Sequence, residues 1–217
     1  MMYNLNTLIG SPVTATDGEI GHVRTFLFDD QSWKVGYLVV DVGNWLKRKE
    51  VVLPITVLER PDWAKKICHA HLTKKQVHDS PEVDAEMPVS RQQEIAMHDY
   101  FGPLASWVDS VSGISLMPTG MKYPVHTPEV LHLRSSSAML GYHVRATDGD
   151  FRILEDFVMD EARWHLGYLD VKSGDWLQNR SVLVPTRWVQ SVSWAHFVIQ
   201  LHHAMAGAQD DLANRQD

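Results

Sequence analysis

The sequence is poor in cysteine and in positive charge. Its single cysteine, Cys68, excludes a disulfide within the chain and a zinc site built from several thiolates. Lysine and arginine number 20 against 27 acidic residues, so the net charge is −7. Proteins that bind a nucleic-acid backbone need a basic face. We therefore expect no nucleic-acid partner, and we expect a cytoplasmic location, with which a lone thiol is compatible.

Long hydrophobic runs are also missing. No apolar run approaches the roughly 18–20 residues that a membrane-spanning helix needs. The N-terminal stretch MMYNLNTLIGSPV lacks the basic region and apolar core of a secretory signal. The sequence contains no glycine-rich phosphate loop and no H-E-x-x-H motif. We expect no direct membrane insertion, no cofactor and no catalytic residues.

One phrase occurs twice. Residues 35–46 read VGYLVVDVGNWL, and residues 166–177 read LGYLDVKSGDWL. Residues 10–71 align with 141–202 without a gap at an offset of 131 residues, and about a third of the paired residues are identical. Two copies are too few, and the repeat too long, for a solenoid. The chain therefore contains one small domain twice.

Each copy has the pattern of a β domain. Asp17-Gly18 and Asp148-Gly149 are signals for tight turns between short strands. Residues 33–42 are rich in Val, Tyr and Leu, as in a buried strand. Pro54 ends the next strand because proline cannot donate to a ladder. Short strands at close spacing, separated by Gly and Pro, predict a small barrel or sandwich.

A unit this small buries only about 60% of the surface that its unfolded chain exposes. It must depend on a few large side chains, since loss of a buried Trp typically costs about 3–5 kcal/mol. The predicted core anchors are two pairs of equivalent tryptophans, Trp33 with Trp164 and Trp63 with Trp194.

The stretches TDGEIGHVRTFLFDDQSWKVGYLVVDVGNWLKRKEVVLP and ATDGDFRILEDFVMDEARWHLGYLDVKSGDWLQNRSVLVP each resemble the PRC-barrel domain family. The resemblance implies an all-β protein with two small SH3-like PRC-type β-barrels and a partly structured linker. It predicts a first barrel over 4–84, a linker over 85–132, a second barrel over 133–205 and a C-terminal tail over 206–217. The family occurs in the photosynthetic reaction-centre H subunit, in a ribosome maturation factor and in uncharacterised bacterial proteins. It implies docking roles and no catalytic residues.

The predicted linker is unusually apolar. A bare loop of this length is uncommon, and its aromatic side chains do not suit a freely solvated tether. We expect it to fold against the barrels, with a candidate short helix over Ser90–Tyr100 that Ser90 caps.

The candidate interaction surface follows the hairpin turn of each copy. Large aromatic side chains after a turn are costly unless they cover something, and basic residues adjoin them. Folding back over the barrel, or a solvated turn that protects a sheet edge, explains the same residues. The surface consists of Trp45, Lys47, Arg48, Lys49, Trp176 and Arg180.

Twelve histidines raise the question of metal binding. His69 and His71 lie two residues apart, and His202-His203 occupies the matching place in the second copy. A metal site needs three or four converging ligands, so we expect no metal. His78-Asp79 and His98-Asp99 could form acid–base pairs, but helix-start and loop roles explain them equally well.

These observations favour a non-enzymatic binding or scaffold protein with an unknown protein partner, at a membrane complex or in a stress response. One alternative is a ribosome or RNA-processing accessory factor, which the negative charge disfavours. A second is a metal-binding or enzymatic protein that uses the histidine-rich barrel ends. Homo-oligomerisation stays open.

Overall fold

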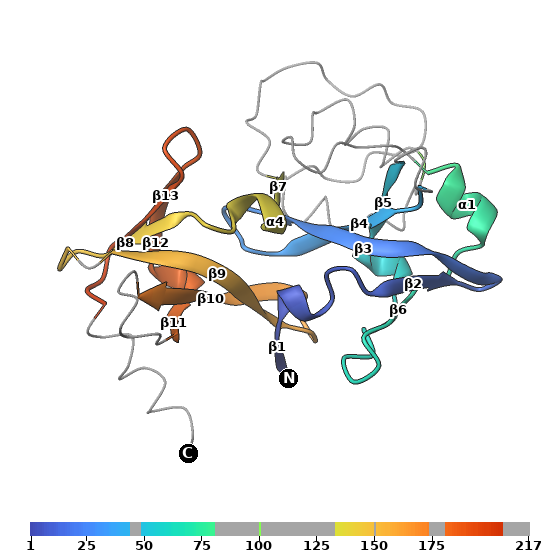
Figure 1. The fold of residues 1–217 in the computed structure, drawn as a ribbon, viewed down its shortest axis with the longest axis horizontal. Coiled ribbons are helices and arrows are strands. Elements are labelled where there is room, and N and C mark those ends of the chain that lie inside the picture. The colour runs from blue at the N-terminus through green and yellow to red at the C-terminus, as the bar shows by residue number, and fades with distance from the viewer. Residues whose placement is uncertain (44–48, 81–99, 101–132, 150, 174–180, 206–217) are drawn as a thin grey trace, which may run out of the picture. The chain divides into compact units, whose positions relative to one another are not determined.

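The chain divides into two β units. In this computed structural model the N-terminal unit is Leu8–Ser135, and the C-terminal unit is Met1–Thr7 together with Ser136–Asp217. The residues that the structure describes are 1–43, 49–80, 100, 133–149, 151–173 and 181–205. The predicted all-β class is confirmed, since the described elements are mainly strands in two separate sheets (Figure 1).

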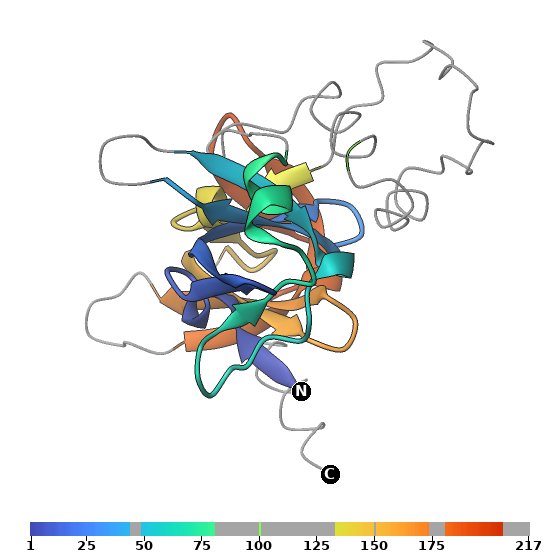
Figure 2. The same cartoon turned by 90° about the vertical axis from the view of Figure 1, so that its right-hand side faces the viewer.

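The N-terminal unit contains a six-stranded sheet with the order β5-β4-β3-β2-β6, and β7 pairs with β3 beside this path. The helix α1 packs on β3 and β5 (Figure 2). The elements are β2 (Pro12–Ala15), β3 (Gly18–Asp29), β4 (Val35–Asp41), β5 (Glu50–Pro54), the 3₁₀ turn η2 (Ile55–Val57), β6 (Cys68–His69), α1 (Lys74–His78) and β7 (Leu133–Ser135).

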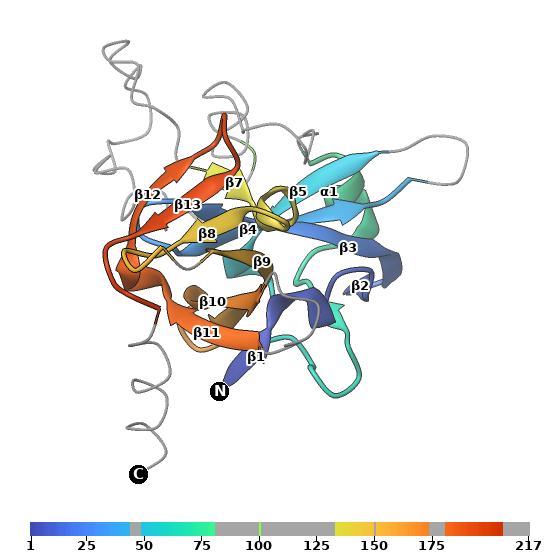
Figure 3. The ribbon, with the colours of Figure 1, turned by 60° about the vertical axis from the view of Figure 1, so that its left-hand side comes forward.

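The C-terminal unit contains a seven-stranded sheet with the order β11-β10-β9-β8-β13-β12, and β1 pairs with β9 beside this path. Figure 3 shows β9 between β8 and β10. Within the described residues, no pairing joins β11 to β12 and closes the ladder. The elements are β1 (Met2–Asn4), η1 (Leu5–Thr7), α4 (Ser136–Met139), β8 (His143–Arg145), β9 (Phe151–Asp160), β10 (His165–Ser173), β11 (Ser181–Pro185), η4 (Thr186–Trp188), β12 (Val189–Ser193) and β13 (Val198–Leu201).

The repeated Asp and Trp residues form one turn in each unit. Asp29 accepts hydrogen bonds from the Ser32 N–H through its carboxylate (2.6 Å) and from the Trp33 N–H through its carbonyl (2.8 Å). Trp33 has the left-handed φ of 59° and stacks on Phe28, with ring centroids 5.5 Å apart. Trp164 repeats the left-handed backbone with φ 49°. The same residue types thus encode the same turn 131 residues later.

In each repeat, the Asp-Gly turn near the start is hydrogen-bonded to the backbone near the end of the same repeat. The Asp17 carboxylate accepts from the Lys74 N–H at 2.8 Å, and the Asp148 carboxylate accepts from the Met205 N–H at 2.9 Å. Lys74 and Met205 are themselves 131 residues apart. The repeat therefore continues to Met205, beyond the aligned range, and Val198–Leu201 form the strand β13.

The first strand of each repeat is exchanged. β1 precedes the first repeat but pairs with β9, with Met2 opposite Asp160 and Asn4 opposite Val158. β7 stands at the equivalent place before the second repeat but pairs with β3. The two registers agree under the 131-residue offset, because Leu133 lies opposite Asp29 just as Met2 lies opposite Asp160. The predicted first barrel, 4–84, contains only the last residue of β1, and the predicted second barrel, 133–205, contains all of β7. The predicted boundaries do not anticipate this exchange.

Candidate functional site

Most of the predicted interaction surface lies outside the described residues. This holds for Trp45, Lys47 and Arg48, and for Trp176 and Arg180. The predicted linker also lies outside the described part, except for Tyr100, and so does the predicted tail after Met205.

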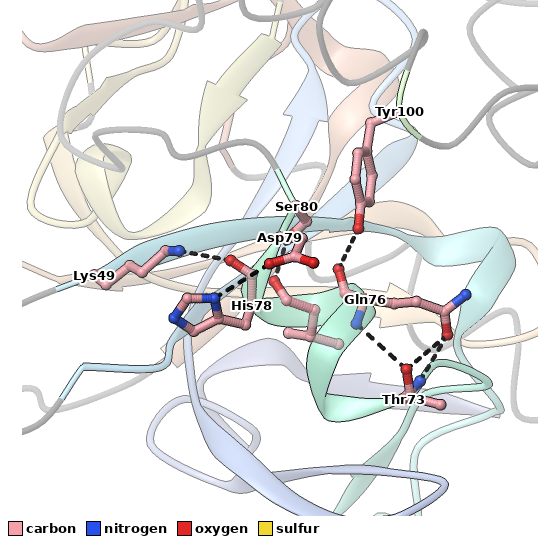
Figure 4. A network of polar contacts seen from close by, with 8 residues as sticks. Lys49, Thr73, Gln76, His78, Asp79, Ser80 and Tyr100 are labelled. Carbon is pink, nitrogen blue, oxygen red and sulfur yellow. Dashed lines mark hydrogen bonds and ion pairs between the residues drawn. The ribbon is translucent and has the colours of Figure 1, made fainter.

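Lys49 is the described member of that surface, and it takes part in a polar network at α1 (Figure 4). Its ammonium group donates to the carbonyl oxygen of His78 at 2.6 Å. Tyr100 donates its hydroxyl to the carbonyl oxygen of Gln76, also at 2.6 Å. The last carbonyl groups of a helix have no partner within the helix and carry partial negative charge. Both donors therefore stabilise the C-terminal end of α1.

The other end of α1 is capped by its own side chains. The Thr73 hydroxyl accepts from the Gln76 N–H at 3.3 Å, and the Gln76 side chain accepts from the Thr73 N–H at 2.9 Å. This reciprocal capping box satisfies the N–H groups of Thr73 and Gln76 at the start of a helix only five residues long. Burial raises the pKa of Tyr100, and the charge of Asp79 adds to this effect. The network thus stabilises both ends of α1.

The His78-Asp79 pair lies at the end of the same helix. The His78 Nδ1 and the Asp79 carboxylate are 3.4 Å apart, and both side chains are exposed. Since the two residues are neighbours on the surface, the contact belongs to the helix end, as Figure 4 shows. His98-Asp99 lies outside the described residues.

The histidines of the strand ends make separate contacts. The His69 Nδ1 lies 2.6 Å from the Thr14 hydroxyl, and the His71 Nε2 lies 3.6 Å from the Glu59 carboxylate. The His202 and His203 rings lie 4.4 Å apart. In the part of the chain that the structure describes, no group of three or more His, Cys, Asp or Glu is arranged to hold a metal ion.

The four predicted core tryptophans differ in burial. Trp33 is buried, with 6% of its surface exposed, whereas Trp63, Trp164 and Trp194 are half-buried. Trp188, which the repeat comparison did not single out, is buried with 8% exposed and lies against the ring of His203. Position 57 of the first copy aligns with Trp188 and holds a valine, so no identity marked it.

An aromatic cluster joins two residues of the β12–β13 hairpin to Tyr142, which precedes β8 in the C-terminal unit. We call Tyr142, Trp194 and Phe197 the hairpin cluster. Tyr142 makes edge contacts with both other rings, at centroid distances of 5.8 Å to Trp194 and 5.3 Å to Phe197. Tyr142 is buried, whereas Phe197 is 57% exposed. The cluster thus presents one large apolar ring to solvent on a buried aromatic support.

The equivalent hairpin of the N-terminal unit has a different surface. Its residues at the three matching positions are Ser11, Trp63 and Lys66. Lys66 and Phe197 share a left-handed backbone, with φ values of 56° and 55°. The left-handed backbone at this position is therefore common to both units, but the side chain there is Lys66 in the N-terminal unit and the exposed ring of Phe197 in the C-terminal unit.

The exchanged strand β1 is held by an acidic pair. Asp156 on β9 lies directly opposite Asp170 on β10. The Asn4 side chain donates to the Asp170 carboxylate at 3.5 Å, and the Asn6 backbone N–H donates to the Asp156 carboxylate at 3.1 Å. Burial raises the pKa of both carboxyl groups, and the charge of Asp170 raises that of Asp156 further.

The exchanged strand β7 uses other chemistry. The Arg134 guanidinium lies 3.0 Å from the Asp30 carboxylate in a largely buried ion pair. The hydroxyl groups of Ser135 and Thr25 are 3.0 Å apart and buried. Thr25 stands where the C-terminal unit has Asp156. Repeat comparison by identity alone passes over these residues, because the two seams share a register but differ in the side chains that make these polar contacts.

Comparison with known proteins confirms the predicted family for the first repeat. Residues 1–68 match the PRC-barrel domain family. The match does not extend to the second repeat, whose relation to the family rests on its alignment with the first. A protein of Deinococcus radiodurans described as uncharacterized is 32% identical over 96 residues, which cover 42% of this chain. The chain spans about a third of that protein's length, 34%.

Proposed function

We propose that this chain, whose residues 1–68 match the PRC-barrel domain family, is a non-enzymatic binding protein that docks a protein partner. The family match supports a binding or scaffold role. The duplication supports it as well, because the repeated residues are turn and core positions, which specify the fold and do not form a set of catalytic residues. Asp17, Asp29 and their equivalents Asp148 and Asp160 all accept backbone hydrogen bonds at turns. What differs between the two units is their surface.

The hairpin cluster is the observation that carries this proposal. A left-handed backbone at a non-glycine residue costs roughly 1–2 kcal/mol, and the fold accepts this cost at both hairpins. In the C-terminal unit that position carries the ring of Phe197, 57% exposed. An aromatic side chain that is already held in place loses little entropy on binding, and such residues dominate binding energy at interfaces. The geometry favours a protein partner with an apolar pocket for this ring.

Exposure of one large apolar residue is common on protein surfaces, so the support beneath it matters. Tyr142 contacts both Phe197 and Trp194, and the Phe197 carbonyl accepts from the His143 N–H at 2.8 Å. These contacts fix the ring and its backbone together. We place the partner at a membrane complex or in a stress response, and the identity of captured proteins tests this placement.

The test is a matched pair of substitutions at equivalent hairpin positions. Phe197→Lys places the residue of the N-terminal hairpin in the C-terminal one and keeps a residue type that adopts this backbone. Lys66→Gln changes the equivalent residue and serves as control. Cross-linked partners captured by the native chain in lysate of the source organism are compared with those captured by each variant.

We expect Phe197→Lys to abolish capture of the partner while the chain stays folded, with a melting temperature lowered by less than about 10 °C, because only the edge contact with Tyr142 is lost and the ring is mostly exposed. Lys66→Gln should capture the partner as the native chain does. Unchanged capture by Phe197→Lys, or equal loss in both variants, contradicts the proposed docking surface.

Among the described residues, no helix is both long and apolar enough to cross a bilayer.

A further inference from the structure

The outer edge of β9 is covered by chain segments from two distant places in the sequence. Its first residues, Phe151–Ile153, pair with β8, and its last, Val158–Asp160, pair with β1. Between them the Asn6 side chain donates to the Glu155 carbonyl oxygen at 3.0 Å. β8 thus covers only the first part of the β9 edge, and residues 1–7 cover the rest.

Residues 1–7, which we call the N-terminal segment, contact this edge as a bound peptide does. Backbone pairing sets the register, as in recognition by strand addition. Side chains then make specific contacts. Leu5 is buried with 1% of its surface exposed, and Asn4 and Asn6 donate to the two acidic side chains described above.

Covering this edge is physically necessary. A strand edge that lacks a partner presents unpaired N–H and C=O groups, which readily pair with another chain. The C-terminal unit obtains its cover from a segment that the chain joins to the N-terminal unit, with the boundary between Thr7 and Leu8. Since the contacts described above all join the segment to the C-terminal unit, the same seven residues from another molecule would make them equally well.

We propose that the edge of β9 also accepts the N-terminal segment of a second copy of this chain, which gives a strand-exchanged dimer. The exchange of β1 and β7 within one chain shows that first strands of this repeat pair outside their own repeat. In the dimer each copy donates and accepts one segment, so the assembly is closed and two-fold symmetric. Its contacts equal those of the single chain, and exchange is a low-cost route to such dimers.

The two arrangements differ in how they depend on concentration. Within one chain the segment reaches its site at an effective concentration of the order of millimolar for a short connection. The dimer should therefore form in proportion to chain concentration and become abundant as that concentration approaches about 1 mM. Oxidation of engineered thiols traps the dimer and reports where the segment is bound.

The experiment uses full-length chains in which Cys68→Val removes the native thiol. One chain carries Met2→Cys and the other carries Asp160→Cys, because these two residues lie directly opposite each other. Opposed residues of an antiparallel pair lie within the Cα separation that a disulfide spans. The chains are mixed, incubated in a buffer of reduced and oxidised glutathione, in which the oxidised form is the oxidant, and separated without reductant.

Two controls define the result. Met2→Cys and Asp160→Cys in the same chain should close an internal disulfide at low concentration. A mixture of Met2→Cys with Ile153→Cys tests random collision, because Ile153 lies on the same strand and is 37% exposed but pairs with β8.

We expect the 2–160 disulfide between chains to exceed the 2–153 product at least tenfold and to increase with concentration. An excess of a synthetic peptide of residues 1–8 should suppress it by occupying the site. The proposal is overturned if the 2–160 product is absent near 1 mM while the internal disulfide forms. Equal yields of the 2–160 and 2–153 products overturn it too. Neither outcome bears on docking through Phe197, which is measured separately.

Discussion

Replacing Leu5 by Ala should destabilise the C-terminal unit, although Leu5 stands at the start of the chain. Leu5 has 1% of its surface exposed and belongs to the C-terminal unit. Replacement of a buried Leu by Ala typically lowers the free energy of unfolding by about 2–5 kcal/mol. The exchange predicts the reverse for Leu133, which precedes the second repeat but is buried in the N-terminal unit with 3% exposed. Leu133→Ala should destabilise the N-terminal unit.

The single cysteine provides the assay. Cys68 lies in β6 of the N-terminal unit with 1% exposed, and desolvation by burial raises its pKa to about 12. Because the thiolate is the reactive form, the thiol should react only when the N-terminal unit opens. Ile199 is the equivalent residue of the C-terminal unit and is fully buried. The double variant Cys68→Val/Ile199→Cys moves the probe to that unit.

Thiol labelling under native conditions then follows the opening equilibrium of each unit. A loss of 2–5 kcal/mol corresponds to labelling that is about 30-fold to several thousand-fold faster, since 1.4 kcal/mol is tenfold. Leu5→Ala should accelerate labelling at position 199 and leave Cys68 close to its original rate. Leu133→Ala should do the opposite. Acceleration of Cys68 by Leu5→Ala, or equal acceleration at both probes, would refute the assignment of the exchanged strands.

Three further predictions concern single residues. Asp170→Asn should raise the melting temperature at pH 7, because it removes the Asp170 carboxylate. This group lies opposite Asp156, and its pKa is raised in the folded state. A raised pKa means that the native state holds more protons than the unfolded state, so this part of stability is complete below pH 3.8 and is lost as pH rises through the folded pKa. The advantage of the variant over the native chain should thus shrink on acidification, and melting curves from pH 3 to 8 check it. Gly21→Ala should destabilise the N-terminal unit strongly, because an added Cβ would lie 2.1 Å from the Asp41 carbonyl oxygen at a φ of 155°. A chain that melts unchanged by circular dichroism contradicts that contact. Arg134→Gln should cost about 1–3 kcal/mol, because it removes the ion pair with the largely buried Asp30 carboxylate, and faster labelling of Cys68 reports the loss.

The sequence by itself determined the local structure of both units. The apolar run over residues 33–42 predicted a strand, and the Asp-Gly stretches predicted turns, because turn geometry depends on residues that are neighbours in the chain. The duplication made this prediction stronger, since the carboxylates of Asp29 and Asp160 each accept a backbone hydrogen bond within the equivalent turn. Burial was predicted less well. Trp33 is a core residue, but its equivalent Trp164 is only half-buried, because burial depends on what each unit packs against it.

Only the tertiary structure decided which strand completes which sheet. β1 and β7 are each three residues long. The sequence of a strand indicates which side chains share a face, but it does not indicate which strand it pairs with. Their pairing with β9 and β3 joins residues more than one hundred positions apart. The tertiary structure also decided the polar contacts that hold the exchanged segments. Asp156 meets Asn6, and Asp30 meets Arg134, only because the strands cross between repeats. Such contacts arise from the three-dimensional match of a free edge with a distant segment, and no local pattern in the sequence encodes it.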